Sequence, residues 1–389
     1  MSKIDLIATA TFGLEAVVAR EVRDLGYQDV KVENARVTFT GDEAAICRTN
    51  LWLRAADRVL VKLGEFQARN FEELFQQTRA LPWADWLPEN AAFPVEGKSI
   101  KSQLHSIPDC QAIVKKAVVE KLKQRYRREW FPESGPRYTI EVALLKDTVT
   151  LTLDTSGAGL HKRGYRTLGS QAPLKETLAA AMVLLSYWEP GRTLIDPFCG
   201  SGTIPIEAAL IGLNAAPGLG RQFAAEKWPV VPAALWQEAR EEARDLAAPE
   251  HSLHILGSDI DSKVLGLARF HARQAGLEGK VFFQKLPAAE LRSSKPYGCV
   301  ICNPPYGERM GGTSEVEELY RGLGNSFKNM DTWSCYVLTA HPGFERFFGK
   351  KADKKRKLYN GRIECHYYQY YGPRPPRSRS PEETAPAQQ

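Results

Sequence analysis

One segment near the middle of the chain, from Asp196 to Thr203, constrains the possible folds more than any other. It reads Asp-Pro-Phe-Cys-Gly-Ser-Gly-Thr, ends a short apolar run at 193–196, and opens an apolar run at 203–212 that has helical spacing. Two glycines between a strand and a helix let the backbone approach a ligand at the carboxyl end of that strand, where open α/β sheets bind their ligands. The segment therefore predicts a parallel sheet wound by helices, with a ligand site at this strand end.

The composition of this loop excludes two common classes of ligand site. No Gly-Lys-Ser or Gly-Lys-Thr follows the loop, so it is not a P-loop phosphate cradle. The dinucleotide fingerprint needs a third glycine or alanine at a position where this chain has Pro205. A carboxylate at Asp196 would repel a phosphate, whereas it would attract a ligand ammonium group. A plain turn between strand and helix is the alternative interpretation.

The next predicted strand, at 253–258, also ends in an acid. Its last residues run into Gly-Ser-Asp-Ile-Asp, with Asp259 in the middle. A carboxylate at such a strand end can accept hydrogen bonds from both hydroxyls of a ribose. A pair of acids that caps the following helix is an equally good interpretation of this stretch alone. Together with the glycine loop, the acid favours a cofactor that contains a nucleoside.

The sequence Asn303-Pro304-Pro305-Tyr306 follows a further predicted strand, at 298–302. Its two prolines remove two backbone donors and stiffen the turn, which leaves the Asn303 side-chain oxygen and the Pro304 carbonyl as acceptors. Acceptors aimed at the hydrogens of an exocyclic base amine direct the nitrogen lone pair at an incoming methyl group. The ring of Tyr306 offers a flat face on which an extruded base can stack. A strained turn after a core strand is the alternative.

The order of predicted elements divides the chain into three folded parts and a tail. Residues 1–65 have the β-α-β-β-α-β order of a ferredoxin-like unit, and residues 66–158 form a second α+β unit. Residues 166–372 show the longer strand–helix alternation of a mostly parallel sheet, which finishes in an antiparallel hairpin at Asn360-Gly361. Residues 373–389 are rich in Pro, Ser, Arg and Gln, and we expect them to be disordered.

The glycine loop, the Asp259 strand end and the Asn-Pro-Pro-Tyr motif together resemble class I S-adenosylmethionine-dependent amino-methyltransferases. Four more stretches make the chain similar to the THUMP-domain RNA methyltransferases, specifically the bacterial proteins related to the guanine-N2 methyltransferase half of the 23S rRNA large-subunit enzymes. Such proteins are often labelled adenine-specific DNA methylases because they share Asn-Pro-Pro-Tyr, and the RNA-binding front half argues against that label. The four stretches lie at 163–166, 172–176, 307–309 and 358–361, and the resemblance covers about residues 3–372.

The resemblance implies a Rossmann-like methyltransferase domain at 166–372, a THUMP RNA-binding domain at 66–158, S-adenosylmethionine as cofactor and RNA as substrate. It favours 23S rRNA, with tRNA as the other option. Two other functions stay open: an adenine-N6 methyltransferase acting on RNA or DNA, and a non-catalytic RNA-binding or ribosome-assembly factor. The implied catalytic residues are Asn303, Pro304, Pro305 and Tyr306, and the implied cofactor contacts are Asp196, Phe198, Gly200, Ser201, Gly202, Thr203, Asp259, Ile260, Ala288 and Asn303.

The chain departs from the class I pattern after the third strand of the sheet. Many of these enzymes place an acid there to bind the adenine amino group, whereas this chain has Gln-Lys-Leu-Pro-Ala-Ala-Glu at 284–290. Either Glu290 or the backbone around Ala288 would then make the adenine contact.

Positive charge is concentrated in two places. Between residues 98 and 128, nine basic residues face two acids, a local net charge of +7 against +6 for the whole chain. Such clustering can neutralise several RNA phosphates, and a solvated helix face is the alternative. A second cluster, at 350–357, has six basic residues and one acid beside the predicted site. The residues predicted to bind RNA are Lys115, Lys116, Lys121, Arg125, Arg128, Lys354 and Lys355.

The remaining composition argues against a metal site, a secreted protein and a membrane protein. Seven cysteines scattered singly fit a reducing cytosol. Cys299 and Cys302 have the spacing of a metal or redox pair, but they lie in a predicted buried strand with no second pair, so we expect core residues and no metal. No run of about 18 apolar residues occurs, and residues 1–11 lack the core of a signal peptide. We therefore predict a cytoplasmic protein.

Overall fold

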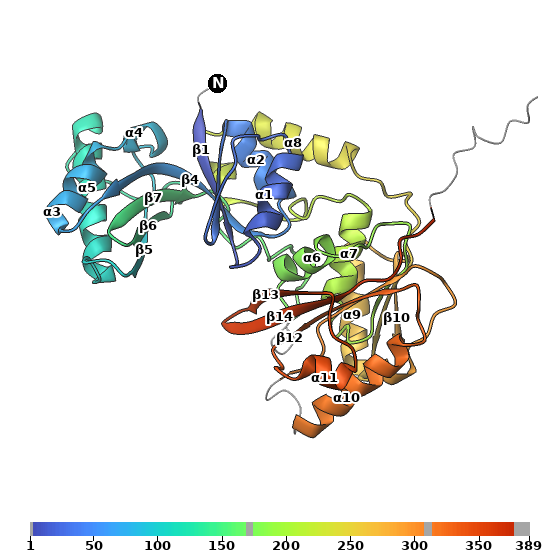
Figure 1. Ribbon diagram of the computed structural model, residues 1–389. Helices are drawn as coiled ribbons and strands as arrows, with labels where there is room; N and C mark the ends of the chain where they lie inside the picture. Colours follow the sequence, from blue (N-terminus) through green and yellow to red (C-terminus); the bar gives the residue numbers. More distant parts are fainter. Residues whose placement is uncertain (1–2, 169–173, 307–312, 377–389) are drawn as a thin grey trace, which may run out of the picture.

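The protein is seen in a computed structural model that describes residues 3–168, 174–306 and 313–376. These residues form two seven-stranded sheets, one in each half of the chain, with helices packed on them (Figure 1). None of the helices in these ranges is both long and apolar enough to cross a membrane. Several stretches that the sequence analysis used lie outside the described residues, namely Ala172, Pro173, 307–309 and the tail from 377 onward.

The first sheet runs without a break through both N-terminal units. Its strand order is β2-β3-β1-β4-β7-β6-β5. The 12-residue strand β4 (Ala56–Gln67) pairs with β1 (Ile4–Ala10) on one side and with β7 (Thr148–Asp154) on the other. The expected boundary between residues 65 and 66 therefore falls inside β4, and this one strand makes the two units a continuous body.

Two helices of this half, α2 and α3, begin after a residue whose side chain caps them. The Asp42 carboxylate accepts a hydrogen bond from the Ala45 backbone at the start of α2, and the Asn70 side chain does the same for Glu73 in α3. The order of the first unit is the expected β-α-β-β-α-β, and the short helix α4 was not expected. The other elements are α1 (Glu15–Asp24), β2 (Lys31–Glu33), β3 (Arg36–Gly41), α2 (Glu43–Trp52), α3 (Phe71–Ala80), α4 (Trp83–Trp86), β5 (Val95–Ile100), α5 (Ile107–Tyr126) and β6 (Ile140–Leu145).

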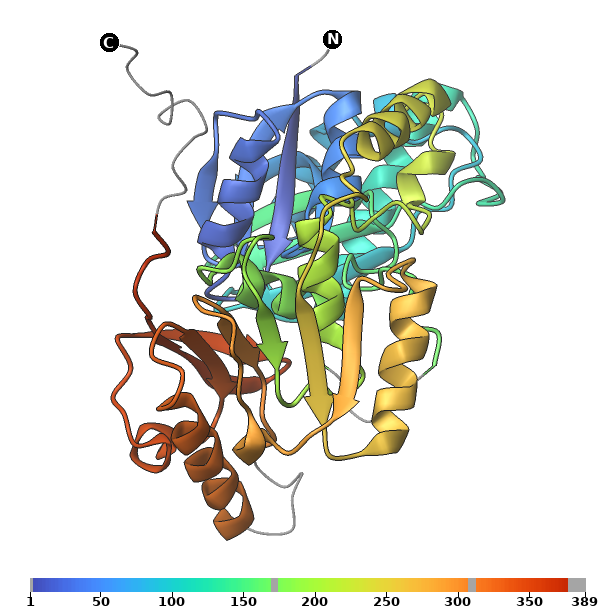
Figure 2. The same cartoon turned by 90° about the vertical axis from the view of Figure 1, so that its right-hand side faces the viewer.

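The second sheet has the order β10-β9-β8-β11-β12-β14-β13. The strands from β10 to β12 are parallel, and β14 is antiparallel to both β12 and β13. The strand order reverses between β8 and β11, and open sheets of this kind bind ligands beyond the carboxyl ends of the strands at such a point. Figure 2 shows the parallel strands β8, β9 and β10 side by side. The elements are α6 (Glu176–Leu184), β8 (Leu194–Asp196), α7 (Thr203–Gly212), η1 (Ala224–Lys227), α8 (Ala233–Asp245), β9 (Ile255–Asp259), α9 (Ser262–Gln274), β10 (Val281–Lys285), η2 (Ala288–Glu290), β11 (Cys299–Cys302), α10 (Thr313–Phe327), β12 (Ser334–Thr339), α11 (Phe344–Phe348), β13 (Lys354–Asn360) and β14 (Ile363–Tyr370).

The turn of the β13–β14 hairpin lies one residue later than the sequence indicates. Asn360 pairs with Ile363, so the two turn residues are Gly361 and Arg362. Gly361 has a φ of +64°, and Arg362 is not among the residues with positive φ, which is the pattern of a type II′ turn with glycine first. Asn360 thus remains in the strand ladder.

Helix α8 and the segment before it bind the two halves together. Although α8 follows α7 in the second half, it packs on α2 of the first half (Figure 1). Arg48 of α2 donates two hydrogen bonds, at 2.8 and 2.9 Å, to the carboxylate of Glu242 in α8. The Trp228 indole stacks on Tyr138 with ring centroids 4.3 Å apart. One apolar core therefore extends from the first sheet into the second half.

Candidate active site

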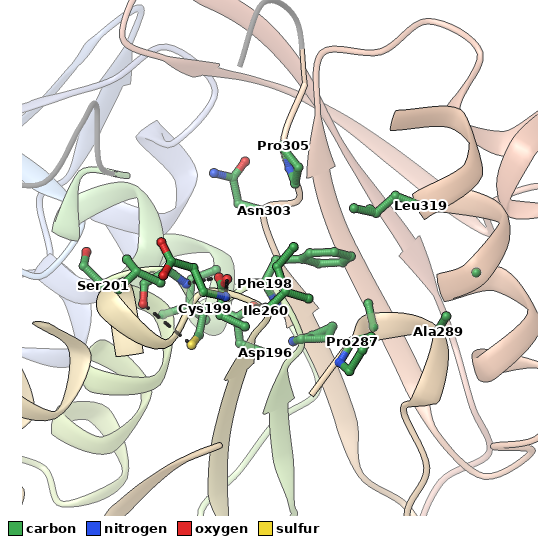
Figure 3. Close-up of a pocket in the computed structure, with 18 of the residues that line it drawn as sticks. Asp196, Phe198, Cys199, Ser201, Ile260, Pro287, Ala289, Asn303, Pro305 and Leu319 are labelled. Carbon is green, nitrogen blue, oxygen red and sulfur yellow. Dashed lines mark hydrogen bonds between the residues drawn. The ribbon is translucent and has the colours of Figure 1, made fainter. Parts of the chain in front are cut away.

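A cavity of about 770 Å³ opens at the carboxyl ends of β8, β9 and β11 (Figure 3). Its size is typical of sites for small molecules. It is built from the loop after β8, the start of the β9–α9 connection, η2, the residues after β11 and one face of α10. The predicted residues that line it are Asp196, Phe198, Gly200, Ser201, Thr203, Asp259, Ile260, Ala288, Asn303 and Pro305, whereas Gly202, Pro304 and Tyr306 do not.

Asp196 brings a buried carboxylate to the floor of this pocket. The residue is 1% exposed, and its Oδ1 atom accepts a hydrogen bond from the Phe198 backbone N–H at 3.0 Å. Within the described ranges no Lys, Arg or His forms an ion pair with it. Burial raises the pKa of Asp196 well above its usual value, and the negative charge of Asp259 adds to the effect. A ligand ammonium group would supply the missing positive charge, and this chemistry fits the amino-acid end of S-adenosylmethionine.

The two glycines of the loop have different tasks. Gly200 (φ +50°) has open space where a side chain would begin, so a ligand can approach its backbone closely. Its backbone N–H donates a hydrogen bond to the Asp259 carboxylate at 3.1 Å. Gly202 (φ +86°) instead faces the protein, because a Cβ there would lie 3.0 Å from the Phe283 ring and 3.1 Å from Ala268. Gly202 therefore has a packing role at the start of α7, and its contact with the cofactor stays a prediction.

Two side chains that the sequence analysis did not single out hold this loop from behind. The guanidinium of Arg166 donates to the Thr203 hydroxyl and pairs with Glu176 at 3.3 Å. His271 of α9 is fully buried, and its Nδ1 atom lies 3.2 Å from the Ser201 carbonyl oxygen. Arg166 lies in one of the stretches behind the resemblance, whereas His271 occupies an ordinary core position of an amphipathic helix and carries no signal in the sequence.

The β11 end of the pocket carries an acceptor that lacks a partner. The Oδ1 atom of Asn303 is buried, and it has no hydrogen bond among the described residues. The Pro305 carbonyl accepts a hydrogen bond from the Tyr320 hydroxyl at 3.1 Å, which fastens the turn to α10. Figure 3 shows Asn303 and Pro305 on one side of the pocket, with Pro287 and Ala289 on another. A buried acceptor without a partner is costly, so a ligand donor at this point would be favoured.

The Tyr306 ring does not face the pocket as the stacking prediction requires. It is 3% exposed, and its hydroxyl accepts a hydrogen bond from Asn360 at 2.7 Å. The ring packs in the apolar core beneath the β13–β14 hairpin. Base stacking on Tyr306 would need this ring to move, and it stays a prediction, as does the acceptor role of the buried Pro304.

Other pocket residues come from elements whose role the sequence did not indicate. Glu315, Glu318, Leu319 and Gly322 lie on one face of α10, and Leu174 precedes α6. Their helical spacing is that of any amphipathic helix, so it gave no reason to place them at the site. At the η2 end, Ala288 lines the pocket and the exposed Glu290 does not, which favours the backbone around Ala288 for the adenine contact.

In the folded protein, the basic cluster at 98–128 has a smaller net positive charge around it than the count along the sequence indicates. Acids from outside that range pair with several of its members. Lys115 donates to Glu133 at 2.6 Å and to the Phe93 carbonyl, and Arg128 pairs with Glu89. Lys98 pairs with Glu141, and Lys123 with Glu120 and Glu129. The count along the chain includes Glu120 but misses the four acids that lie outside 98–128, namely Glu89, Glu129, Glu133 and Glu141. The cations with no ion pair among the described residues are Lys101, Lys116, Lys121, Arg125 and Arg127.

The second basic cluster lies on β13 and just before it. Lys354 is exposed, whereas Lys355 pairs with Glu345 and Lys357 with Glu364 at 2.5 Å. The seven cysteines are all buried and unpaired by disulfides, including Cys299 and Cys302 inside β11. The parts of the chain that the structure describes hold no group of three His, Cys, Asp or Glu side chains suited to a metal ion.

Comparisons with known proteins match this arrangement from residue 5 to residue 369. Residues 5–60 match the model of the RlmL ferredoxin-like domain, residues 68–154 the THUMP domain, and residues 163–369 the RMKL-like methyltransferase domain. A Bacillus subtilis protein named as an RNA methyltransferase, YpsC, is 52% identical over 373 residues, which are 95% of this chain and 97% of that protein.

Solved structures of related proteins have the same fold over nearly the whole chain. One from Listeria monocytogenes, described as a predicted N6-adenine-specific DNA methylase, is 54% identical with a TM-score of 0.92 and covers 96% of this chain and 97% of its own. SMU.472, described as a methyltransferase complexed with SAH, is 47% identical with a TM-score of 0.92 and covers 97% of this chain and 100% of its own. The chain therefore belongs to the RMKL-like methyltransferase family, with an RlmL ferredoxin-like domain and a THUMP domain ahead of its methyltransferase domain.

Proposed function

We propose that this protein is a cytoplasmic enzyme that transfers a methyl group from S-adenosylmethionine to the exocyclic N2 amine of a guanine in RNA, with 23S rRNA as its substrate. The observation that carries the proposal is the unpartnered Asn303 oxygen in a pocket that also holds the unpaired Asp196 carboxylate. The first atom fits a donor on the substrate and the second fits a cation on the cofactor. The SAH named for the related structure SMU.472 supports the same cofactor.

Different residues of the pocket would hold the different parts of the cofactor. Asp196 would hold the ammonium group of the cofactor, Gly200 would allow its close approach, and Asp259 would accept from the ribose hydroxyls while it keeps its bond to the Gly200 N–H. Backbone and apolar atoms around Ala288 and Ile260 would enclose the adenine. When bound, S-adenosylmethionine supplies a methyl group on a sulfonium, which is already a good leaving group.

Asn303 would act on the substrate amine. Its Oδ1 atom would accept a hydrogen bond from one N–H of the amine, which favours a tetrahedral nitrogen whose lone pair points at the methyl carbon. The new N–C bond forms as the S–C bond breaks, and the extra proton on nitrogen then leaves to solvent. Positioning accounts for most of the rate enhancement in such a reaction, since well-oriented groups can gain about 7–11 kcal/mol.

The choice of RNA and guanine rests on the front half and on the resemblance. A THUMP match at residues 68–154 supports an RNA substrate over DNA. The RlmL ferredoxin-like match at residues 5–60 supports the likeness to the guanine-N2 half of the 23S rRNA enzymes. The label of the Listeria structure is the observation that favours the second candidate, an adenine-N6 methyltransferase.

Mass spectrometry of modified nucleosides tests the proposal. We would compare 23S rRNA, 16S rRNA and tRNA from a deletion strain, its parent, and strains complemented with the unaltered gene or with Asn303→Ala. We expect N2-methylguanosine to fall in 23S rRNA on deletion and to return only with the unaltered gene. A change in N6-methyladenosine instead would favour the second candidate. Unchanged nucleosides in all RNA classes would favour a non-catalytic role.

A further inference from the structure

The β13–β14 hairpin holds the catalytic motif by a side chain at its tip. Asn360, the last residue of β13, donates from Nδ2 to the Tyr306 hydroxyl at 2.7 Å. The Cys365 thiol in β14 donates to the same oxygen at 3.5 Å. Tyr306 directly follows Asn303-Pro304-Pro305, and the Tyr320 hydroxyl of α10 donates to the Pro305 carbonyl. The motif is thus fastened between α10 and the hairpin.

The hairpin in turn rests on the N-terminal domain. The Phe12 ring packs edge-on against Tyr359, with centroids 5.9 Å apart. Gly13 (φ +93°) lies so close to β13 that a Cβ there would be 2.6 Å from the Lys357 carbonyl oxygen. The Phe12-Gly13 turn itself is held by Glu15, which accepts from the Gly13 N–H at 2.8 Å and from the Ala35 N–H at 2.9 Å.

We propose that the Phe12-Gly13 turn and Asn360 form one positioning unit for the catalytic motif, so that the ferredoxin-like domain contributes to methyl transfer and not only to RNA binding. The contacts run without a gap from Gly13 through Lys357 and Asn360 to Tyr306. The inference rests on the proposed function, because it assumes that the motif orients the target amine. A shift of about 1 Å in such a motif can lower the rate about 100-fold.

A double-mutant cycle tests the Asn360 end of the unit. Asn360→Ala, Tyr306→Phe and the double variant would be compared in single-turnover transfer of labelled methyl groups to total RNA from the deletion strain, so that no particular target base is assumed. We expect Asn360→Ala to lower the rate about tenfold or more, while the affinities for S-adenosylmethionine and RNA stay within about twofold. In the Tyr306→Phe background the same change should have little further effect, because the shared hydrogen bond is already lost.

Two glycines provide a matched pair for the other end. Gly13 and Gly26 both have strongly positive φ, +93° and +98°, but nothing lies within 4 Å of a Cβ built on Gly26. Gly13→Ala and Gly26→Ala therefore impose similar backbone strain, and only the first pushes on β13. We expect Gly26→Ala to lower the melting temperature with little effect on the transfer rate. Gly13→Ala, which adds the clash with β13, should lower the melting temperature further and the transfer rate about tenfold.

The outcomes separate this inference from the proposed function. Equal rate losses from Asn360→Ala in both Tyr306 backgrounds, or equal rates for Gly13→Ala and Gly26→Ala, would overturn the positioning unit while methyl transfer to RNA stands. No transfer to RNA by the unaltered protein would overturn the proposed function and this inference with it. Equal effects of Asn360→Ala on rate and on cofactor affinity would indicate general loosening of the domain, which also overturns it.

Discussion

The two sheets contain the same number of strands but place their functional residues by different means. In the second sheet, parallel strands bring residues 196, 259, 288 and 303 to one edge, although more than 100 positions separate the first from the last. In the first sheet, pairing is mostly antiparallel, and the surface expected to bind RNA lies on the helix α5. Parallel topology brings the motifs at strand ends to one site. The net charge of a helix surface, in contrast, depends on which of its basic side chains form ion pairs with acids on neighbouring segments.

The contrast explains why one region was easier to predict than the other. The carboxyl ends of parallel strands lie at the same edge of a sheet, so Asp196 and Asn303 could be assigned to one pocket from the sequence. The charge of the 98–128 stretch depends on Glu89, Glu133 and Glu141, which lie outside the counted residues and reach them only through the fold.

The largest expected effect is at the acceptor in the parallel sheet. Asn303→Ala should lower the rate of methyl transfer at least about 100-fold, or ~2.7 kcal/mol, because the amine loses the group that orients it. The affinity for S-adenosylmethionine should change little, since Asp196 and the glycine loop remain. Single-turnover rates and calorimetric titration would measure the two quantities. Asn303→Asp, which keeps an acceptor oxygen, serves as the control, and transfer within tenfold of the unaltered rate in Asn303→Ala would remove this residue from the chemistry.

The next effect concerns the cofactor and depends on pH. Burial holds the pKa of Asp196 above its usual value, so at low pH the carboxyl is protonated and neutral. A bound ammonium group favours the ionised form, so affinity for S-adenosylmethionine should fall as the pH drops through the pKa of the ligand-free protein, by about tenfold per pH unit. Asp196→Asn should bind about 30-fold more weakly at neutral pH, ~2 kcal/mol, and should lose this pH dependence. Equal pH profiles for the two proteins would contradict the assignment.

A smaller effect is expected on the first sheet, where the charges can be sorted into two sets. Lys121, Arg125 and Arg127 have no ion pair among the described residues, whereas Lys115, Lys123 and Arg128 do. Each phosphate contact adds about 0.7–0.9 to the slope of log affinity against log salt. Changing the first set to Gln should flatten that slope by about two and weaken RNA binding about tenfold at moderate salt.

The second set is the matched control for that experiment. Changing Lys115, Lys123 and Arg128 to Gln removes the same formal charge, but these side chains are already paired with acids, so the salt slope should change by less than about one. Filter binding over a range of salt would measure both. Equal slopes for the two triple variants would mean that pairing in the fold does not decide which cations meet RNA, and that the sequence count alone was the better guide.

The same limit on sequence reasoning applies to the elements that connect the sheets. The strand ends at the site and the presence of the hairpin, though not the position of its turn, could be predicted from local patterns. The packing of α8 on α2 could not, because its partners are nearly 200 positions apart and its polar face is typical of any surface helix. Tyr306 shows the same limit at the site, since only the fold places its hydroxyl beside Asn360. No local sequence pattern indicates an interaction between two segments that are far apart in the chain.

The smallest expected effect tests whether the two sheets behave as one body. The Arg48–Glu242 pair is bidentate and about one-third exposed on each side, so its loss in Glu242→Gln should cost only ~1 kcal/mol. For a chain that unfolds as one body of this length, that corresponds to a fall of only about 1 °C in melting temperature, because the unfolding entropy grows with chain length. Because α8 of the second half packs on α2 of the first half, we expect the two halves to unfold together in a single calorimetric transition, and Glu242→Gln should shift that whole transition. Glu278→Gln is the control, since its contact with Arg273 is 3.9 Å long and largely exposed, and it should shift nothing. Two separate transitions, with only one displaced by Glu242→Gln, would show that the halves unfold independently.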